Sequence, residues 1–88
     1  MGSPFGNEKL DITYPSPWPY TVIGEDEFKM RVAIGEICDE LEHFVEVSNR
    51  SRTGRYCSLK IEAIVNSDEE RHAIYHKLLQ SDEIRYVV

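Results

Sequence analysis

The feature that most constrains the fold is an alternation of apolar and polar residues from Cys57 to Ala63, within the run Tyr56–Val65. One set of alternate positions is apolar throughout: Cys57, Leu59, Ile61, Ala63 and Val65. The other set begins with Tyr56, Ser58, Lys60 and Glu62. Successive side chains of a strand point to opposite faces, so this segment predicts a strand with one covered face and one exposed face. A sheet with helices on one side only meets that requirement.

A first strand is predicted ahead of this segment. Three residues, Trp18, Tyr20 and Val22, alternate with Pro19, Thr21 and Ile23, which is the period of a strand that ends at Gly24. Proline blocks a central position of a hydrogen-bonded ladder. We therefore expect Tyr14–Pro19 to form an extended lead-in, and residues 1–11 to form a flexible N-terminal tail.

A helix follows, from about Asp26 to Leu41. The acids Glu25, Asp26 and Glu27 suit the positive end of a helix dipole. One apolar stripe runs along it at helical spacing: Met30, Ile34, Ile37, Cys38 and Leu41. Val32 lies off this stripe and is expected to point towards solvent or a partner.

The remaining elements complete the order β-α-β-β-α-β. Phe44–Ser48 predicts a strand with Val45 and Val47 inward, and Asn49–Arg55 a hairpin in which Gly54 accepts a positive φ. Ser67 and Glu70 form a capping box, so a second helix begins at Asp68. Its apolar face is expected to hold Ile74, Tyr75, Leu78 and Leu79, and a last strand to run from Ile84 to Val88.

This order predicts an α+β fold of the ferredoxin-like, split β-α-β type. The four-stranded antiparallel sheet has strand order 4-1-3-2, and right-handed crossovers place both helices on one face. The chain has 88 residues, so we assign residues 12–88 to a single domain with little depth for a secluded cavity.

Charge and cysteine content narrow the function classes. The net charge of -6 disfavours general nucleic-acid binding, and no apolar run is long enough to suggest a membrane span. No export signal is apparent, so we expect a cytoplasmic protein. Cys38 and Cys57 have neither a disulfide framework nor metal-type spacing, and both are expected to be buried free thiols.

The charge is unevenly distributed along the chain. Eight acids and two bases lie between Glu25 and Glu46, whereas Val47–Ile61 holds four bases and no acid. Arginines bind carboxylates and phosphates bidentately, so the hairpin predicts a site for an anion or a protein partner. Its candidate residues are Arg50, Ser51, Arg52, Arg55, Tyr56 and Ser58. The alternative is that these arginines serve solubility and protect a sheet edge.

No catalytic or cofactor motif emerges. His72 and His76 lie one helical turn apart, with Asp68 a turn earlier, and two histidines at this spacing can share a metal ion. Such side chains are more often exposed to solvent, so we assign no metal site. RNA-recognition modules need stacking rings on the open sheet face, where the third strand offers only Tyr56. Acylphosphatase-like enzymes cradle phosphate after the first strand, where Glu25–Glu27 would repel it.

A family resemblance rests on three groups of residues. They are Tyr14-Pro15-x-Pro17-Trp18-x-Tyr20-x-Val22-Ile23-Gly24, Ser51-x-x-Gly54-x-Tyr56-x-Ser58 and Ile84-x-x-Val87. This combination resembles the YbeD-like family of small uncharacterised bacterial proteins. The resemblance implies a ferredoxin-like fold similar to the ACT regulatory domains, with no established activity. The family's hairpin often has a lysine where this chain has Thr53.

Together these features predict a non-enzymatic regulatory or interaction domain without a cofactor. Its expected ligand is a protein partner or a small anionic metabolite, as in ACT-like domains. The alternative is an RNA contact through the arginine-rich hairpin. The acidic first helix and the basic hairpin also predict a weak homodimer, because each copy is complementary to another.

Overall fold

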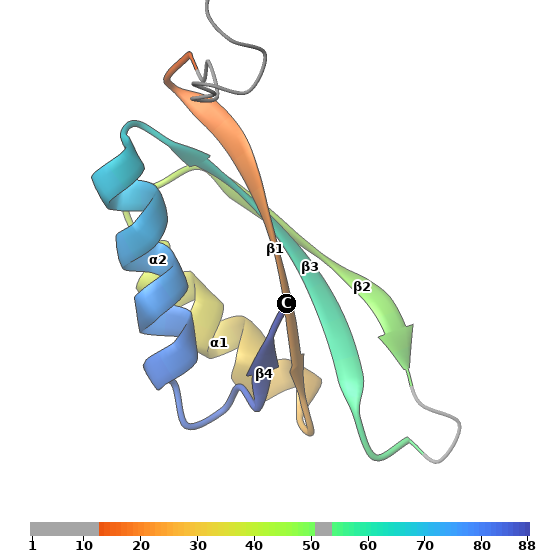
Figure 1. The fold of residues 1–88 in the computed structure, drawn as a ribbon. Helices are drawn as coiled ribbons and strands as arrows, with labels where there is room; N and C mark the ends of the chain where they lie inside the picture. Colours follow the sequence, from red (N-terminus) through yellow and green to blue (C-terminus); the bar gives the residue numbers. More distant parts are fainter. Residues whose placement is uncertain (1–12, 51–53) are drawn as a thin grey trace, which may run out of the picture.

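The computed structural model describes residues 13–50 and 54–88, so the tail predicted for residues 1–11 lies outside them. The elements are β1 (Ser16–Gly24), α1 (Glu27–Ile37), β2 (His43–Arg50), β3 (Cys57–Val65), α2 (Asp68–Gln80) and β4 (Tyr86–Val87). The strands form one antiparallel sheet in the order β2-β3-β1-β4, as predicted. Both helices cover the same face of this twisted sheet, on the left in Figure 1.

The core lies between β3 and the two helices. All five apolar positions of β3 are buried, and Leu59, Ile61, Ala63 and Val65 are completely inaccessible. Each strand beside β3 adds half-buried or buried residues to the same side: Val45 and Val47 from β2, and Tyr20 and Val22 from β1. The predicted facing of the central strands is therefore confirmed.

β1 differs from the prediction because it begins at Ser16 and includes two prolines. The carbonyl oxygens of Thr21 and Ile23 accept hydrogen bonds from the β4 segment. Backbone polar groups alternate in direction along a strand, so those of Pro17 and Pro19 point to the same side. The short β4 pairs only with Val22 and Ile23 and does not reach these prolines. Their missing N–H groups therefore cost no ladder bond, and the strand tolerates them.

Helix α1 begins where predicted but ends earlier. The Asp26 carboxylate accepts a hydrogen bond from the Lys29 N–H at 3.0 Å and caps its start. The helix ends at Ile37 rather than at Leu41, and no basic residue lies in its last turn. Glu36, Asp39 and Glu40 instead place negative charge near the negative end of the dipole, which disfavours further turns.

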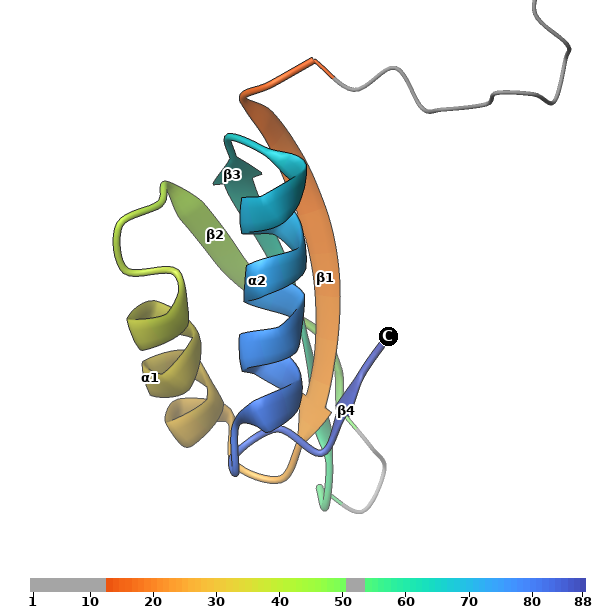
Figure 2. The ribbon, with the colours of Figure 1, turned by 60° about the vertical axis from the view of Figure 1, so that its left-hand side comes forward.

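Helix α2 starts at Asp68, capped by Ser67, as predicted. Ile74 and Leu78 are buried, as predicted, but Tyr75 and Leu79 are exposed. The predicted apolar face of four residues is therefore correct for two of them and wrong for the other two. Each exposed residue follows a buried one and is rotated about 100° further around the helix axis. Figure 2 shows that α2 runs along β1, with α1 on its other side.

The last strand is also shorter than predicted, with two residues in place of five. Ile84 is buried but precedes the strand, and its N–H bonds to the Ser81 carbonyl oxygen at 3.3 Å. Backbone hydrogen bonds of 2.8 Å from Arg85 and Val88 to β1 flank the paired residues. Ile84 therefore packs into the core from a turn that precedes β4. The strand itself pairs with only two residues at the edge of β1.

Gly24, at the end of β1, supplies a direct stability test. A Cβ atom at this position would lie 2.6 Å from the Glu83 carbonyl oxygen and 2.6 Å from the Met30 sulfur. We expect Gly24→Ala to lower the free energy of unfolding by about 1–3 kcal/mol, because backbone would have to shift. Gly35→Ala is the matched control, since no described atom outside its chain neighbours and its own helix backbone lies within 4 Å of its Cβ position. In urea unfolding it should stabilise the protein by about 1 kcal/mol; equal effects of both variants would contradict the assigned crowding.

Candidate interaction site on the open face of the sheet

The face of the sheet turned away from the helices is not covered by any described element, on the right in Figure 1. The strand register places its side chains in rows across the sheet. In one row Phe44 of β2 pairs with Glu62 of β3, which pairs with Pro19 of β1. In the next row Glu46 pairs with Lys60, which pairs with Thr21. Each row thus has a charged residue of β3 at its centre, and the first row has an apolar residue, Phe44 or Pro19, on either side of it.

Phe44 dominates this surface, with 65% of the residue exposed to solvent. The inward facing predicted for Val45 and Val47 places Phe44 on the opposite, open face of β2, and the structure confirms this facing. A shallow hollow of about 550 Å³ lies beside the ring. The side chains of Pro19, Glu46, Lys60 and Glu62 also contribute to its lining. Both charge signs are present, so the hollow suits a mixed polar and apolar surface better than a single ion.

The predicted hairpin site is divided by a bulge in β2. The β2–β3 register shifts between Val47 and Asn49, which brings Arg50 opposite the buried Cys57 on the helix side. There the Arg50 guanidinium pairs with a Glu27 carboxylate oxygen at 2.8 Å. Ser58 pairs with Ile23 and Asn49 on the open face instead. Arg50 and Ser58 therefore point to opposite sides of the sheet and do not form one site.

The other predicted members of that site are only partly described. Ser51 and Arg52 lie outside the residues that the structure describes. Arg55 is exposed, and Tyr56 is half-buried and directly precedes β3. Gly54 has a φ of 75°, which confirms the positive φ predicted for the hairpin.

Glu27 is the centre of a small ion-pair network on the helix side. Its second carboxylate oxygen accepts a hydrogen bond from the Arg31 Nε at 2.9 Å, one helical turn along α1. The hydrogen bonds from Arg31 and Arg50 hold the pKa of Glu27 below its ordinary value. A carboxylate between two guanidinium groups is thus an internal partner for the hairpin, which the sequence did not reveal because Glu27 and Arg50 are far apart in the chain.

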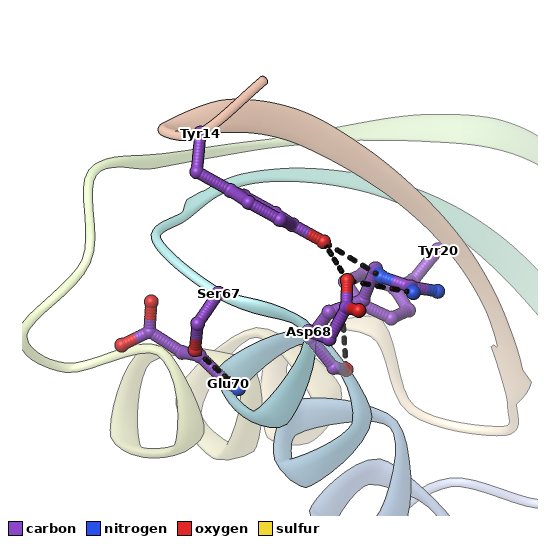
Figure 3. Close-up of polar contacts among 6 residues, drawn as sticks. Tyr14, Tyr20, Ser67, Asp68 and Glu70 are labelled. Atoms are coloured by element: carbon purple, nitrogen blue, oxygen red, sulfur yellow. Dashed lines mark hydrogen bonds and ion pairs between the residues drawn. The ribbon is translucent and has the colours of Figure 1, made fainter. Parts of the chain in front are cut away.

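A second polar cluster joins the start of β1 to the first turn of α2 (Figure 3). The Tyr14 hydroxyl donates to the Asp68 carboxylate, which also pairs with the Arg71 guanidinium at 3.2 Å. The Arg71 guanidinium carbon lies 4.4 Å from the centre of the Trp18 ring. The Tyr20 hydroxyl donates to the Arg71 carbonyl oxygen at 2.8 Å. Arg71 is therefore the residue that these three aromatic side chains share.

Sequence reasoning missed this cluster, although Tyr14, Trp18 and Tyr20 carry the resemblance to the family. The hydrogen bonds from Tyr14 and Arg71 lower the pKa of Asp68, and burial raises the pKa of Tyr20 to about 12. All of these contacts are internal, so the motif fixes the first strand against α2. Its alternating aromatic residues were the available signal, but they did not indicate Arg71 as the common partner.

Other chemically versatile side chains do not converge on a centre. Cys38 and Cys57 are buried free thiols, as predicted, and burial raises the pKa of Cys38. Across residues 13–50 and 54–88, no three His, Cys, Asp or Glu side chains are arranged to hold a metal ion. His76 lies in an edge-on contact with the Tyr75 ring, at 5.7 Å between centroids. None of the helices in the described ranges is long and apolar enough to cross a membrane.

The fold and this open face define a class, the small ferredoxin-like α+β domains with helices on one side. Within that class the chain belongs to the family described as Protein of unknown function (DUF493), which matches residues 9–88. This is the YbeD-like family, so the resemblance noted from the sequence is confirmed. The Campylobacter jejuni relative named Uncharacterized protein Cj0253 is 36% identical over 67 residues, which cover 76% of this chain and 77% of the relative.

Two solved structures share the fold. A solution structure of protein HP0495 from Helicobacter pylori has a TM-score of 0.79 at 22% identity, over 100% of this chain and 97% of that one. A second solution structure of HP0495 has a TM-score of 0.62 at 23% identity, over 98% and 100% of the two chains. At these identities the similarity supports the architecture alone.

The Glu27 network predicts a pH-dependent contribution to stability. A lowered pKa in the folded state stabilises the protein above the ordinary carboxyl pKa, and this contribution is lost as the pH falls through the lowered value. We expect Glu27→Gln to be less stable than the wild type at about pH 7, with the difference closing towards about pH 3. Urea unfolding across that range measures it.

The control for this test is Glu36→Gln on the same helix. The Glu36 carboxylate makes no ion pair with any residue in the described ranges. Its replacement should leave the pH dependence of unfolding almost unchanged. A Glu27→Gln difference that stays constant from neutral to acid pH would show that the carboxylate is not held by the two arginines.

Proposed function

We propose that this protein is a non-enzymatic interaction domain that binds a protein partner across the open face of its sheet. The observation that carries the proposal is the exposed Phe44 ring at the hollow, which Pro19 also lines. Burying a phenylalanine side chain at an interface is worth about 1.5–3 kcal/mol. Interface hot spots are commonly large side chains near the centre of the interface, where the surrounding contacts with the partner exclude water.

The surrounding charges favour a protein over an ion or a nucleic acid. Lys60 lies in a row with Glu46, and Glu62 occupies the next position on the same face. A phosphate backbone would meet two acids for one base on these residues, so its binding would be opposed. A protein surface with both charge signs and an apolar centre can match the same pattern.

The anionic-metabolite version of the proposal, by analogy with ACT domains, receives less support. Arg50, one of the three arginines predicted to hold such an anion, is engaged by Glu27 at 2.8 Å. An anion would have to compete with a carboxylate that is already in place. An RNA contact through the hairpin meets the same competition, so both rank below a protein partner.

A non-enzymatic role also fits the reactive groups of the described residues. Burial favours the protonated, less nucleophilic form of Cys38, and Nδ1 of His43 contacts the Leu41 carbonyl oxygen at 2.9 Å. We place this role in the cytoplasm, where buried thiols stay reduced. The domain would then act by holding or regulating its partner rather than by transforming a substrate.

The test compares proteins captured from native lysate by immobilised wild-type chain, Phe44→Glu and Leu79→Glu. Leu79 is an exposed residue of α2 on the helix side, so the same change there controls for added charge. We expect at least one protein to be retained by the wild type and by Leu79→Glu. Its retention by Phe44→Glu should fall at least tenfold, because a charge replaces the central apolar contact.

Circular dichroism must first show that all three chains have the same fold. A capture profile that Phe44→Glu leaves unchanged would contradict the open-face site. A labelled single-stranded oligoribonucleotide provides the second arm. Tight binding that weakens steeply with rising salt would favour the RNA alternative over the protein partner.

A further inference from the structure

A separate surface lies on the outward side of α1. Phe28 is 73% exposed and Val32 is 46% exposed, although both are apolar. They are one helical turn apart, and Gly35 follows at the next position on the same side of the helix. This stripe of Phe28, Val32 and Gly35 faces away from the buried residues Met30 and Ile34. It is distinct from the open sheet face, which lies on the other side of the molecule.

Gly35 is the unexpected member of this stripe. Glycine is the least favourable residue after proline in the interior of a helix. Apart from its chain neighbours and the backbone of its own helix, no described atom lies within 4 Å of the position that its Cβ would occupy, so tertiary packing does not require a glycine here. A missing side chain on an exposed helix surface leaves a gap at which another chain can approach closely.

We propose that α1 packs antiparallel against α1 of a second copy, with each Phe28 ring seated at Gly35 of the other copy. The two residues are seven positions apart, about 10.5 Å along the helix. A two-fold axis that passes beside Val32, near the midpoint between Phe28 and Gly35, places the Phe28 ring of each copy at Gly35 of the other copy. The contact is therefore made twice. The two Val32 side chains then meet near the axis. The stripe has a large ring, Phe28, at one end and a gap, at Gly35, at the other. It is therefore complementary in shape to the same stripe of an antiparallel copy.

The flanking charges favour the same arrangement. Lys29 and Glu36 lie on the same flank of the helix, about two turns apart, one near each end of the stripe. Neither makes an ion pair with another residue of the described ranges. The two-fold axis places Lys29 of one copy beside Glu36 of the other, which gives two ion pairs. Arg31, on the opposite flank, is paired with Glu27 at 2.9 Å within the same copy.

This contact replaces the pairing of acidic helix and basic hairpin that the sequence indicated, since Glu27 engages Arg50 within one copy. It is small, and both copies carry a net charge of -6, so it is weak and concentration-dependent. It also leaves the open face accessible, so a copy in the dimer can bind a partner there. Its failure would therefore leave the proposed function untouched.

Sedimentation velocity of the full chain, up to about 1 mM protein, tests the contact. We expect reversible dimerisation of the wild type. Lys29→Glu should weaken it at least fivefold, because two attractive pairs become repulsive. The double variant Lys29→Glu with Glu36→Lys should restore it. Lys60→Glu makes the same charge change on β3, on the open face of the sheet and away from α1, and should leave the dissociation constant within about twofold of the wild type.

Gly35→Leu supplies a second, independent test. The side chain enters open space in one copy, so the midpoint of urea unfolding should not fall. It fills the gap that receives Phe28, so dimerisation should weaken at least tenfold. A wild type that stays monomeric at about 1 mM overturns the proposal. Full dimerisation of Gly35→Leu, or no rescue in the double charge variant, overturns it as well.

Discussion

The rest of the structure depends on the burial of one row of side chains along β3. This strand pairs with both β1 and β2, and its apolar row lies under the two helices. Because the side-chain period of a strand is two, burying that row sends every other residue to the opposite face. The same constraint that builds the core therefore also creates the open face that carries Phe44. Core and candidate interaction site are two consequences of one alternating sequence.

Electrostatics then decides which charged groups are available to a ligand. A single bulge after Val47 turns Arg50 from the open side to the helix side, within reach of Glu27. Arg71 is likewise held among Tyr14, Trp18 and Asp68. Both arginines are thus paired with side chains of the same chain. What the open face retains is an apolar ring with mixed charges, which suits a protein surface.

Local sequence patterns were sufficient to predict most of the fold. The predictions that failed depended on contacts between residues far apart in the chain. The element order with right-handed crossovers was sufficient to give the strand order, and the acids Glu25–Glu27 and the capping box at Ser67 were sufficient to give the helix starts. The prolines of β1 were misjudged because their effect depends on how far β4 extends along that edge. The hairpin site was misjudged because a bulge and the distant Glu27 redirect Arg50. The length of β4 and the ion pair between Glu27 and Arg50 both depend on residues that are distant in the sequence. Patterns among neighbouring residues therefore do not predict them.

The most direct test of this account compares the same substitution on the two faces of β3. Ile61 is fully buried under the helices, whereas Ile64 lies on the open face and is half-buried. The account predicts that Ile61→Asp lowers the free energy of unfolding in urea by at least about 3 kcal/mol, because it buries an unpaired charge. Ile64→Asp should cost less than about 1.5 kcal/mol. Equal losses for the two variants would contradict the division of the sheet into a core face and an open face.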